Sequence, residues 1–143
     1  MNEITRRPMA IVCDLDGTLC LFDGRGPFEM ERCGTDMMNV PVERLLRILH
    51  DKGQMILLVS GRFEQYRPQT ETWLRAHGLH WYDALYLRAD GDYRKDTEIK
   101  RELYEQRIKP YYDVWLSLDD RNQSVECWRA LDIPCFQVAP GDF

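Results

Sequence analysis

Residues 11–20 have the sequence IVCDLDGTLC, an apolar run that ends in two aspartates one residue apart, Asp14 and Asp16. Aspartate is a poor strand former, and its carboxylate is costly to bury without a partner. A buried strand that ends in two such residues therefore indicates a fold that uses them at a functional site.

The same strand-like pattern recurs along the chain. Apolar runs lie at residues 9–16, 54–61, 84–89, 113–120 and 135–139. Most are apolar on both faces, which is typical of strands in a parallel sheet that helices cover on both sides. Helical patterns lie between them at residues 42–53, 68–77, 96–109 and 121–131. This alternation predicts a single α/β domain over residues 1–143, Rossmann-like, with a central parallel sheet of about five strands and helices on both faces.

Composition and charge narrow the class of protein. The chain has 143 residues, 44% of them hydrophobic, and a formal net charge of -5. An acidic balance gives no support to broad binding of a nucleic-acid backbone, although it leaves open a protein that grips only the end of a strand. The first residues, MNEITRRP, lack an apolar signal segment, and no apolar run reaches the roughly 20 residues of a membrane span. The prediction is a soluble, unsecreted protein.

The cysteines agree with that setting. There are five of them, Cys13, Cys20, Cys33, Cys127 and Cys135, an odd number without a CxxC pair. This pattern argues against a structural zinc site and favours reduced thiols in an intracellular, cytoplasmic protein.

Polar residues end four of the five apolar runs. Asp14 and Asp16 end the first, Ser60-Gly61-Arg62 the second, Arg88 the third and Asp119-Asp120-Arg121 the fourth. The carboxyl ends of parallel strands meet at one edge of the sheet, where ligands of such folds bind. We therefore expect these side chains to lie together.

Their chemistry points to phosphoryl transfer. Four clustered carboxylates would repel one another, and a hard divalent cation, Mg²⁺, relieves the conflict. Ser60, Arg62 and a lysine between residues 95 and 100 would hold an anionic substrate beside it. One aspartate of the first pair would be the nucleophile that forms an aspartyl-phosphate, and the other the general acid and base. Gly17 permits a sharp turn beside the phosphate, and Thr18 adds a hydroxyl or a backbone donor.

These motifs resemble a known group of enzymes. DLDGT, then SGR, a lysine-bearing helix and LDDR resemble the haloacid dehalogenase (HAD) superfamily of aspartate-nucleophile phosphatases. The segments DGRGPF, RKD and the terminal QVAPGDF are similar to the 3′-phosphatase domains of bacteriophage polynucleotide kinase/phosphatases. The resemblance extends from about Pro8 to Phe143 and, for a phage-encoded protein, implies the host cytoplasm.

The resemblance implies specific roles. Asp14 would be the nucleophile and Asp16 the general acid/base. The implied Mg²⁺ ligands are the carboxylates of Asp14, Asp119 and Asp120 and the main-chain carbonyl of Asp16. Ser60 and Lys100 would hold phosphoryl oxygens. The candidates for substrate or supporting contacts are Thr18, Arg25, Arg62, Arg88, Asp96 and Arg121.

Several of these roles have structural alternatives. Lys95 competes with Lys100, but Asp96 and Lys100 are four residues apart on one helix, so the carboxylate can orient the ammonium. Arg62 could be an ion-pair partner of a clustered acid, and Asp119-Asp120 could cap the following helix. Trp73, Trp115 and Trp128 fall at core positions and are interpreted as packing residues rather than base-stacking platforms.

The predicted reaction is Mg²⁺-dependent hydrolysis of terminal 3′-phosphomonoesters on DNA or RNA. About forty residues separate DLDGT from SGR, too few for a large cap domain, so a polymer end could enter. The chain has no GxxxxGK[ST] phosphate loop, so the kinase half of the phage enzymes is not found in it, and a separate kinase or ligase is a candidate partner. The alternatives are a phosphatase for mononucleotides or other small phosphate esters, a phosphotransferase, and a catalytically silent module that binds phosphate ends.

Overall fold

A computed structural model of the protein describes residues 6–143. The N-terminal residues 1–5, to which part of the signal-segment prediction applies, lie outside the described residues. Within the described part, no helix combines the length and the apolar character needed to cross a membrane.

The centre of the fold is a parallel sheet of five strands, as predicted. Its spatial order is β5-β4-β1-β6-β7, and each neighbouring pair is parallel. The strands are β1 (Met9–Asp14), β4 (Met55–Phe63), β5 (Ala84–Arg88), β6 (Asp113–Asp119) and β7 (Cys135–Gln137). β1 lies between β4 and β6, so residues 10–13 are fully buried, and this is why the run is apolar on both faces.

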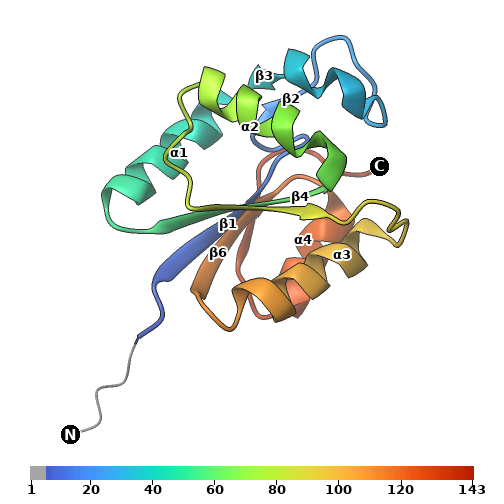
Figure 1. Cartoon of the computed structure of the whole chain (residues 1–143). Helices are drawn as coiled ribbons and strands as arrows, with labels where there is room; N and C mark the ends of the chain where they lie inside the picture. The colour runs from blue at the N-terminus through green and yellow to red at the C-terminus, as the bar shows by residue number, and fades with distance from the viewer. Residues whose placement is uncertain (1–5) are drawn as a thin grey trace, which may run out of the picture.

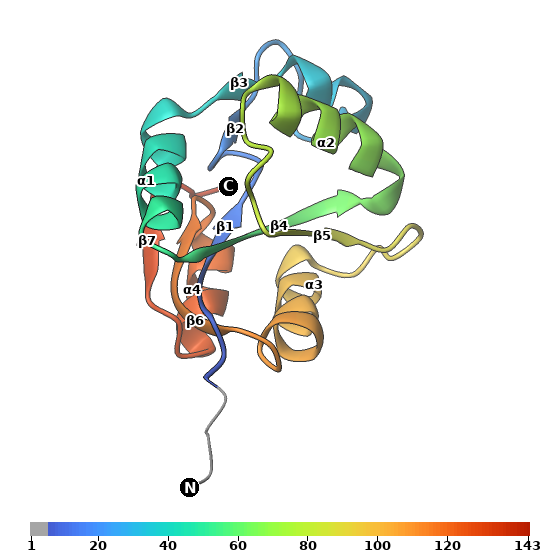
Figure 2. The same cartoon turned by 60° about the vertical axis from the view of Figure 1, so that its left-hand side comes forward.

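Two pairs of helices cover the two faces of the sheet (Figures 1 and 2). α1 (Val40–Asp51) and α2 (Arg67–Ala76) pack on one face, where Leu46 and Trp73 join the first core cluster. α3 (Asp96–Leu103) and α4 (Asn122–Ala130) pack on the other, where Val125 and Trp128 join the second. Because both faces are covered, this arrangement is the predicted Rossmann-like fold.

Local departures from the predicted elements have identifiable causes. The helical pattern 96–109 is α-helical only to Leu103 and continues as a π-helical turn, Tyr104–Ile108, which buries both of those residues. The prediction that Trp115 packs in the core is wrong. Its side chain lies near the amino end of β6, before pairing with β7 begins at Ser117, and is 38% exposed. Trp73 and Trp128 are buried, as predicted.

The segment between β1 and α1 contains structure that the sequence did not predict. Residues Cys20–Leu21 (β2) and Met37–Met38 (β3) form a two-stranded antiparallel sheet, with a 3-10 helix, Met30–Thr35, between them. We call residues 20–39 the β2–β3 insert. Among the described residues it is the only structure besides α1 between β1 and β4, so this region holds no large cap, in agreement with the prediction.

Candidate active site

Three carboxylates meet where β1 and β6 end. Asp14, Asp119 and Asp120 are all buried, and one oxygen from each lies within 4.8 Å of the others. Burial and the repulsion from Asp119 raise the pKa of Asp14 well above its usual value, and the same two causes raise the pKa of Asp120. A hard divalent cation accepts such an all-oxygen set and would compensate its charge, so these residues fit Mg²⁺.

Lys100 supplies the positive charge nearest to this carboxylate cluster. Its ammonium lies 3.1 Å from Asp14 Oδ1, 2.9 Å from Asp119 Oδ2 and 3.3 Å from Asp96 Oδ2. Burial alone would lower the pKa of Lys100, but these carboxylates raise it well above its usual value and keep the side chain charged. Lys95 is exposed at the start of α3. The structure therefore places Lys100, and not Lys95, in the cluster.

The turn after β1 explains the residues that follow Asp16. Gly17 has φ +84°, and a Cβ there would lie 2.2 Å from Asp120 Oδ2. Only glycine accepts both this backbone conformation and this approach. The hydroxyl of Thr18 lies 3.1 Å from Asp120 Oδ1 and 3.3 Å from Asp14 Oδ2, so it contacts both carboxylates.

Asp16 belongs to a second group of charges. Its Oδ1 accepts hydrogen bonds from Nη2 of Arg62 at 2.6 Å and from Nη2 of Arg25 at 2.9 Å. The Asp16 side chain is 21% exposed, whereas those of both arginines are buried. Arg62 therefore makes the ion pair considered above, and it makes it with the candidate acid/base. The Asp16 atom that would bind a metal is therefore its main-chain carbonyl oxygen.

Asp36, which the sequence pattern did not indicate, completes this second group. Its fully buried carboxylate accepts from Arg25 Nε at 2.6 Å, Arg25 Nη2 at 2.8 Å and Arg62 Nη2 at 3.0 Å. Asp36 lies just before β3, in the β2–β3 insert, where no apolar run precedes it. Only the need of two buried arginines for a further acid could have signalled it. We call Asp16, Arg25, Arg62 and Asp36 the arginine clamp.

The end of β4 places Ser60 next to Arg62 of the arginine clamp and Gly61 next to Asp96. Ser60 is 1% exposed, and its Oγ accepts the backbone N–H of Arg62 at 3.1 Å. A Cβ on Gly61 would lie 1.9 Å from Asp96 Oδ1, so a side chain here would displace that acid.

Arg88 and Asp96 link the loop after β5 to the carboxylate cluster. Arg88 Nη2 lies 3.3 Å from Asp96 Oδ1, and the other Asp96 oxygen faces Lys100. Burial disfavours the charged form of Asp96, but Lys100 and Arg88 outweigh it and lower its pKa. Both residues therefore support Lys100, while Asp96 is also the first residue of its helix.

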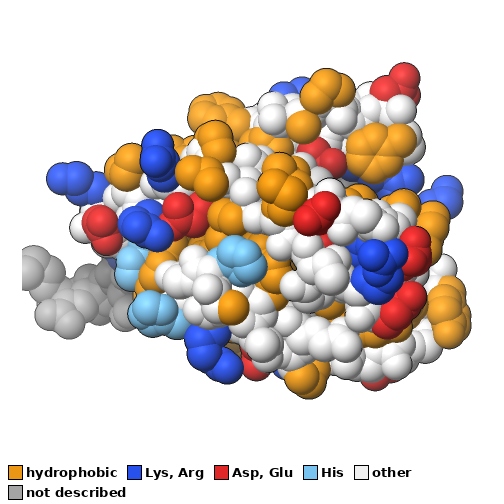
Figure 3. Space-filling view, turned by 90° about the horizontal axis from the view of Figure 1, so that it is seen from above, with side chains coloured by type: hydrophobic (Ala, Val, Ile, Leu, Met, Phe, Trp, Pro, Cys, Tyr) orange, Lys and Arg blue, Asp and Glu red, His pale blue; other side chains and the backbone are white. Residues whose placement is uncertain are grey.

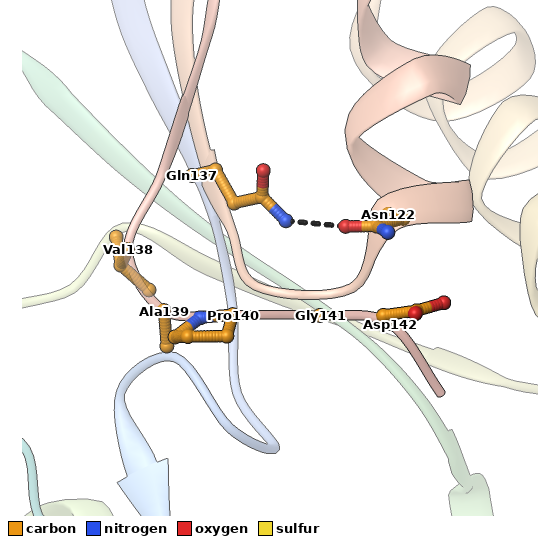
Figure 4. Close-up of a pocket in the computed structure, with 7 residues that line it drawn as sticks. All are labelled: Asn122, Gln137, Val138, Ala139, Pro140, Gly141 and Asp142. Atoms are coloured by element: carbon orange, nitrogen blue, oxygen red, sulfur yellow. Dashed lines mark hydrogen bonds between the residues drawn. The ribbon is translucent and has the colours of Figure 1, made fainter.

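The C-terminal segment braces the loop that carries Asp119 and Asp120. Gln137 donates to the main-chain oxygen of Asp120 at 2.9 Å. It also donates to Asn122 Oδ1 at 2.7 Å, the bond drawn in Figure 4. A Cβ on Gly141 would lie 1.8 Å from that same Asp120 oxygen. A pocket of about 500 Å³ lies here, lined by Asn122 and residues 137–142.

Arg121 contacts the C-terminal segment, and the substrate contact proposed for it stays a prediction. Its Nε donates to the main-chain oxygen of Phe143 at 3.0 Å, and its guanidinium lies 5.7 Å from the centre of that ring. In this structure Arg121 anchors the C-terminal segment.

Known proteins are similar to this chain in both sequence and fold. Residues 8–143 match the family model described as the polynucleotide kinase PNKP phosphatase domain. The chain is 30% identical over 131 residues to a protein of Autographa californica nuclear polyhedrosis virus described as a bifunctional polynucleotide kinase/RNA ligase, covering 89% of this chain and 19% of that protein.

Solved structures agree. A chain in the structure of the Pnkp1/Rnl/Hen1 complex is 44% identical, with a TM-score of 0.93 over 100% of this chain and 50% of that one. A class C acid phosphatase from Bacillus anthracis shares the fold at 20% identity, with a TM-score of 0.64 over 94% of this chain and 68% of that one. This chain thus spans half or less of its two more similar relatives. The family match covers nearly the whole sequence, and the chain belongs to the polynucleotide kinase PNKP phosphatase domain family of HAD phosphatases.

Proposed function

We propose that the protein is a Mg²⁺-dependent polynucleotide 3′-phosphatase that acts through an aspartyl-phosphate on Asp14. The observation that carries the proposal is the position of the Asp14 carboxylate, buried at a strand end beside the ammonium of Lys100 and the Asp119-Asp120 pair. A phosphatase with a carboxylate nucleophile needs that carboxylate beside a fixed cation and an all-oxygen metal site.

In the first step, a carboxylate oxygen of Asp14 attacks phosphorus and the bond from phosphorus to the 3′-oxygen breaks. The Asp16 carboxyl group gives its proton to that oxygen, which leaves as a 3′-hydroxyl. In the second step, the Asp16 carboxylate takes a proton from water, which attacks the same phosphorus. The bond from phosphorus to the Asp14 oxygen breaks, inorganic phosphate leaves, and both aspartates return to their starting forms.

Other residues position these two acids. Lys100 holds the Asp14 carboxylate in place and offers its ammonium to a phosphoryl oxygen, together with the Ser60 hydroxyl. Arg25 and Arg62 of the arginine clamp fix the carboxylate of Asp16, the acid that gives and takes the proton. When bound by Asp14, Asp119 and Asp120, Mg²⁺ would supply charge neutralisation for the phosphoryl group and the carboxylates.

The proposed substrate is the 3′-phosphorylated end of RNA, with DNA as the alternative. The relative at 44% identity was also solved in a structure named as an RNA repair complex, which supports RNA. The net charge of -5 favours contact with a strand end over broad backbone binding. On the face seen in Figure 3, basic side chains are mixed with acidic ones rather than gathered in a continuous patch.

We further propose that kinase and ligase activities come from another domain or chain. The names of the relatives include a kinase/ligase and a complex with Rnl and Hen1, and this chain spans half or less of each. The phosphatase would then prepare 3′-hydroxyl ends for those activities.

The test is phosphate release from 3′-phosphorylated RNA and DNA oligonucleotides, a 5′-phosphorylated oligonucleotide and a nucleoside 3′-monophosphate, with Mg²⁺ and with a chelator. Asp14→Asn should abolish release, whereas Asp51→Asn, the same change at an exposed acid at the end of α1, should not. Release that survives Asp14→Asn would refute the nucleophile. Equal or faster release from the monophosphate would assign the enzyme to small phosphate esters instead.

A further inference from the structure

A large aromatic side chain stands in solvent at the edge of the sheet that carries the site. Tyr93 is 84% exposed on the loop between β5 and α3. This loop projects beyond the carboxyl end of β5 in both views (Figures 1 and 2). An exposed ring of this size buries little apolar surface and so contributes little to folding.

The loop holds Tyr93 in a defined position. Arg88 Nη1 donates to the main-chain oxygen of Asp92 at 3.0 Å and to that of Arg94, the residues on either side of Tyr93. The side chains of Asp92 and Arg94 also pair at 2.7 Å, and the Asp92 N–H closes a turn onto Ala89. The backbone at Tyr93 is therefore ordered before any ligand binds.

A second ring supports the first from beneath. Phe63, the last residue of β4, lies 5.6 Å from Tyr93 between ring centres, at an interplanar angle of 65°. The Arg88 guanidinium lies 5.6 Å from the centre of the Phe63 ring. One edge of Tyr93 is thus packed against the protein, while most of its surface faces solvent.

The same arginine connects this platform to the nucleophile. Arg88 contacts Asp96, Asp96 contacts Lys100 and Lys100 contacts Asp14, each through atoms 3.1 to 3.3 Å apart. Arg88 therefore belongs to the ion-pair network that reaches the reacting carboxylate, and it also holds the loop that carries the exposed ring.

We propose that Tyr93 stacks on a nucleobase of the strand whose 3′-phosphate lies at Asp14. A preordered, solvent-facing ring beside a site for phosphate ends suits a base, because every base has a stacking face and no sequence-specific contact is needed. The inference rests on the proposed function and adds a binding site for the polymer outside the reacting group.

The experiment compares a 3′-phosphorylated oligoribonucleotide with p-nitrophenyl phosphate, which has no base. In the full chain, Tyr93→Ala should lower the ratio of kcat/KM for the oligonucleotide to that for p-nitrophenyl phosphate about ten-fold, through KM, as loss of one base–aromatic stack would. Tyr93→Trp should restore the ratio. Tyr111→Ala is the matched control, since Tyr111 is 64% exposed in the connection before β6, at the opposite edge of the sheet, and should leave the ratio unchanged.

A binding measurement separates affinity from turnover. In an Asp14→Asn background, Tyr93→Ala should weaken binding of the labelled oligonucleotide by the same factor. An unchanged ratio, or an equal loss on both substrates, would overturn the stacking role while leaving the 3′-phosphatase proposal in place. Wild-type protein that hydrolyses p-nitrophenyl phosphate but not the oligonucleotide would refute the proposed function itself, and the stacking role with it.

Discussion

Asp36 offers the sharpest test of the arginine clamp. Its carboxylate is fully buried and accepts three hydrogen bonds of 2.6, 2.8 and 3.0 Å from Arg25 and Arg62. Asp36→Asn keeps the shape of the side chain but removes its charge and turns an NH₂ group toward a guanidinium donor. Removing one partner of a buried ion pair costs about 3 to 5 kcal/mol, and the retained amide oxygen favours the lower end.

The expected loss converts into a melting temperature. Unfolding entropy is about 2.1 cal/mol/K for each of the 143 residues, or about 0.3 kcal/mol/K in all, so about 3 kcal/mol lowers Tm by about 10 °C. Because the clamp also positions Asp16, a shift of its carboxylate by about 1 Å should lower kcat/KM about 100-fold.

Calorimetry and steady-state kinetics on the purified variant measure the two effects. The matched control is Glu71→Gln, which removes the acid of a half-buried pair with Arg67 on α2 and should cost about 0.5 kcal/mol, or about 2 °C. If Asp36→Asn lowers Tm no more than Glu71→Gln does, the clamp does not contribute the expected free energy of unfolding. If Asp36→Asn lowers Tm as expected but leaves kcat/KM unchanged, the clamp stabilises the fold without positioning Asp16.

Three further predictions concern the carboxylate cluster. Lys100→Met should lower kcat about 100-fold or more, since it removes a preorganised charge, whereas Lys95→Met should leave kcat unchanged; equal effects would reverse the assignment. Gly141→Ala forces a Cβ to within 1.8 Å of the main-chain oxygen of the braced loop and should cost about 1 to 3 kcal/mol, whereas Gly34→Ala, where nothing lies within 4 Å, should be nearly neutral in thermal unfolding. Mg²⁺ at about 100 times its Kd should raise stability by about 2.7 kcal/mol in the wild type and not in Asp119→Asn. The raised pKa values of Asp14 and Asp120 mean that the metal-free cluster retains protons above the usual aspartate range. Because Mg²⁺ must displace those protons, the gain in stability should grow as pH rises and shrink as pH falls. A gain that depends on neither pH nor Asp119 would exclude the site.

The sheet and the carboxylate cluster were predictable from sequence for the same reason. The buried strands are continuous apolar runs, and their carboxyl ends meet at one edge, so Asp14 and Asp119 could be placed together from the pattern alone. Two-residue strands such as β2 and β3 give no periodic pattern, so the sequence did not predict the β2–β3 insert. Nothing local marked Gly141 either, because the oxygen that it approaches lies in the loop after β6.

The arginines show a different limit. A sequence gives an arginine's position but not its partner, since Arg62 meets Asp16 across 46 residues and Asp36 across 26. Three arginines of this chain therefore have three different structural roles. Arg62 holds the candidate acid/base, Arg88 orders a loop, and Arg121 anchors the C-terminal segment.

The two charge groups also depend on different parts of the chain, and this division can be tested. The carboxylate cluster and Lys100 come from β1, β6 and α3, whereas two members of the arginine clamp, Arg25 and Asp36, come from the β2–β3 insert. A change in the insert should therefore disturb the proton transfer of Asp16 without emptying the metal site. Asp36→Asn should accordingly keep the wild-type rise in Tm on addition of Mg²⁺ while its kcat falls. Loss of both together would mean that the nucleophile and the acid/base are held as one unit, and that the clamp supports the metal ligands as well.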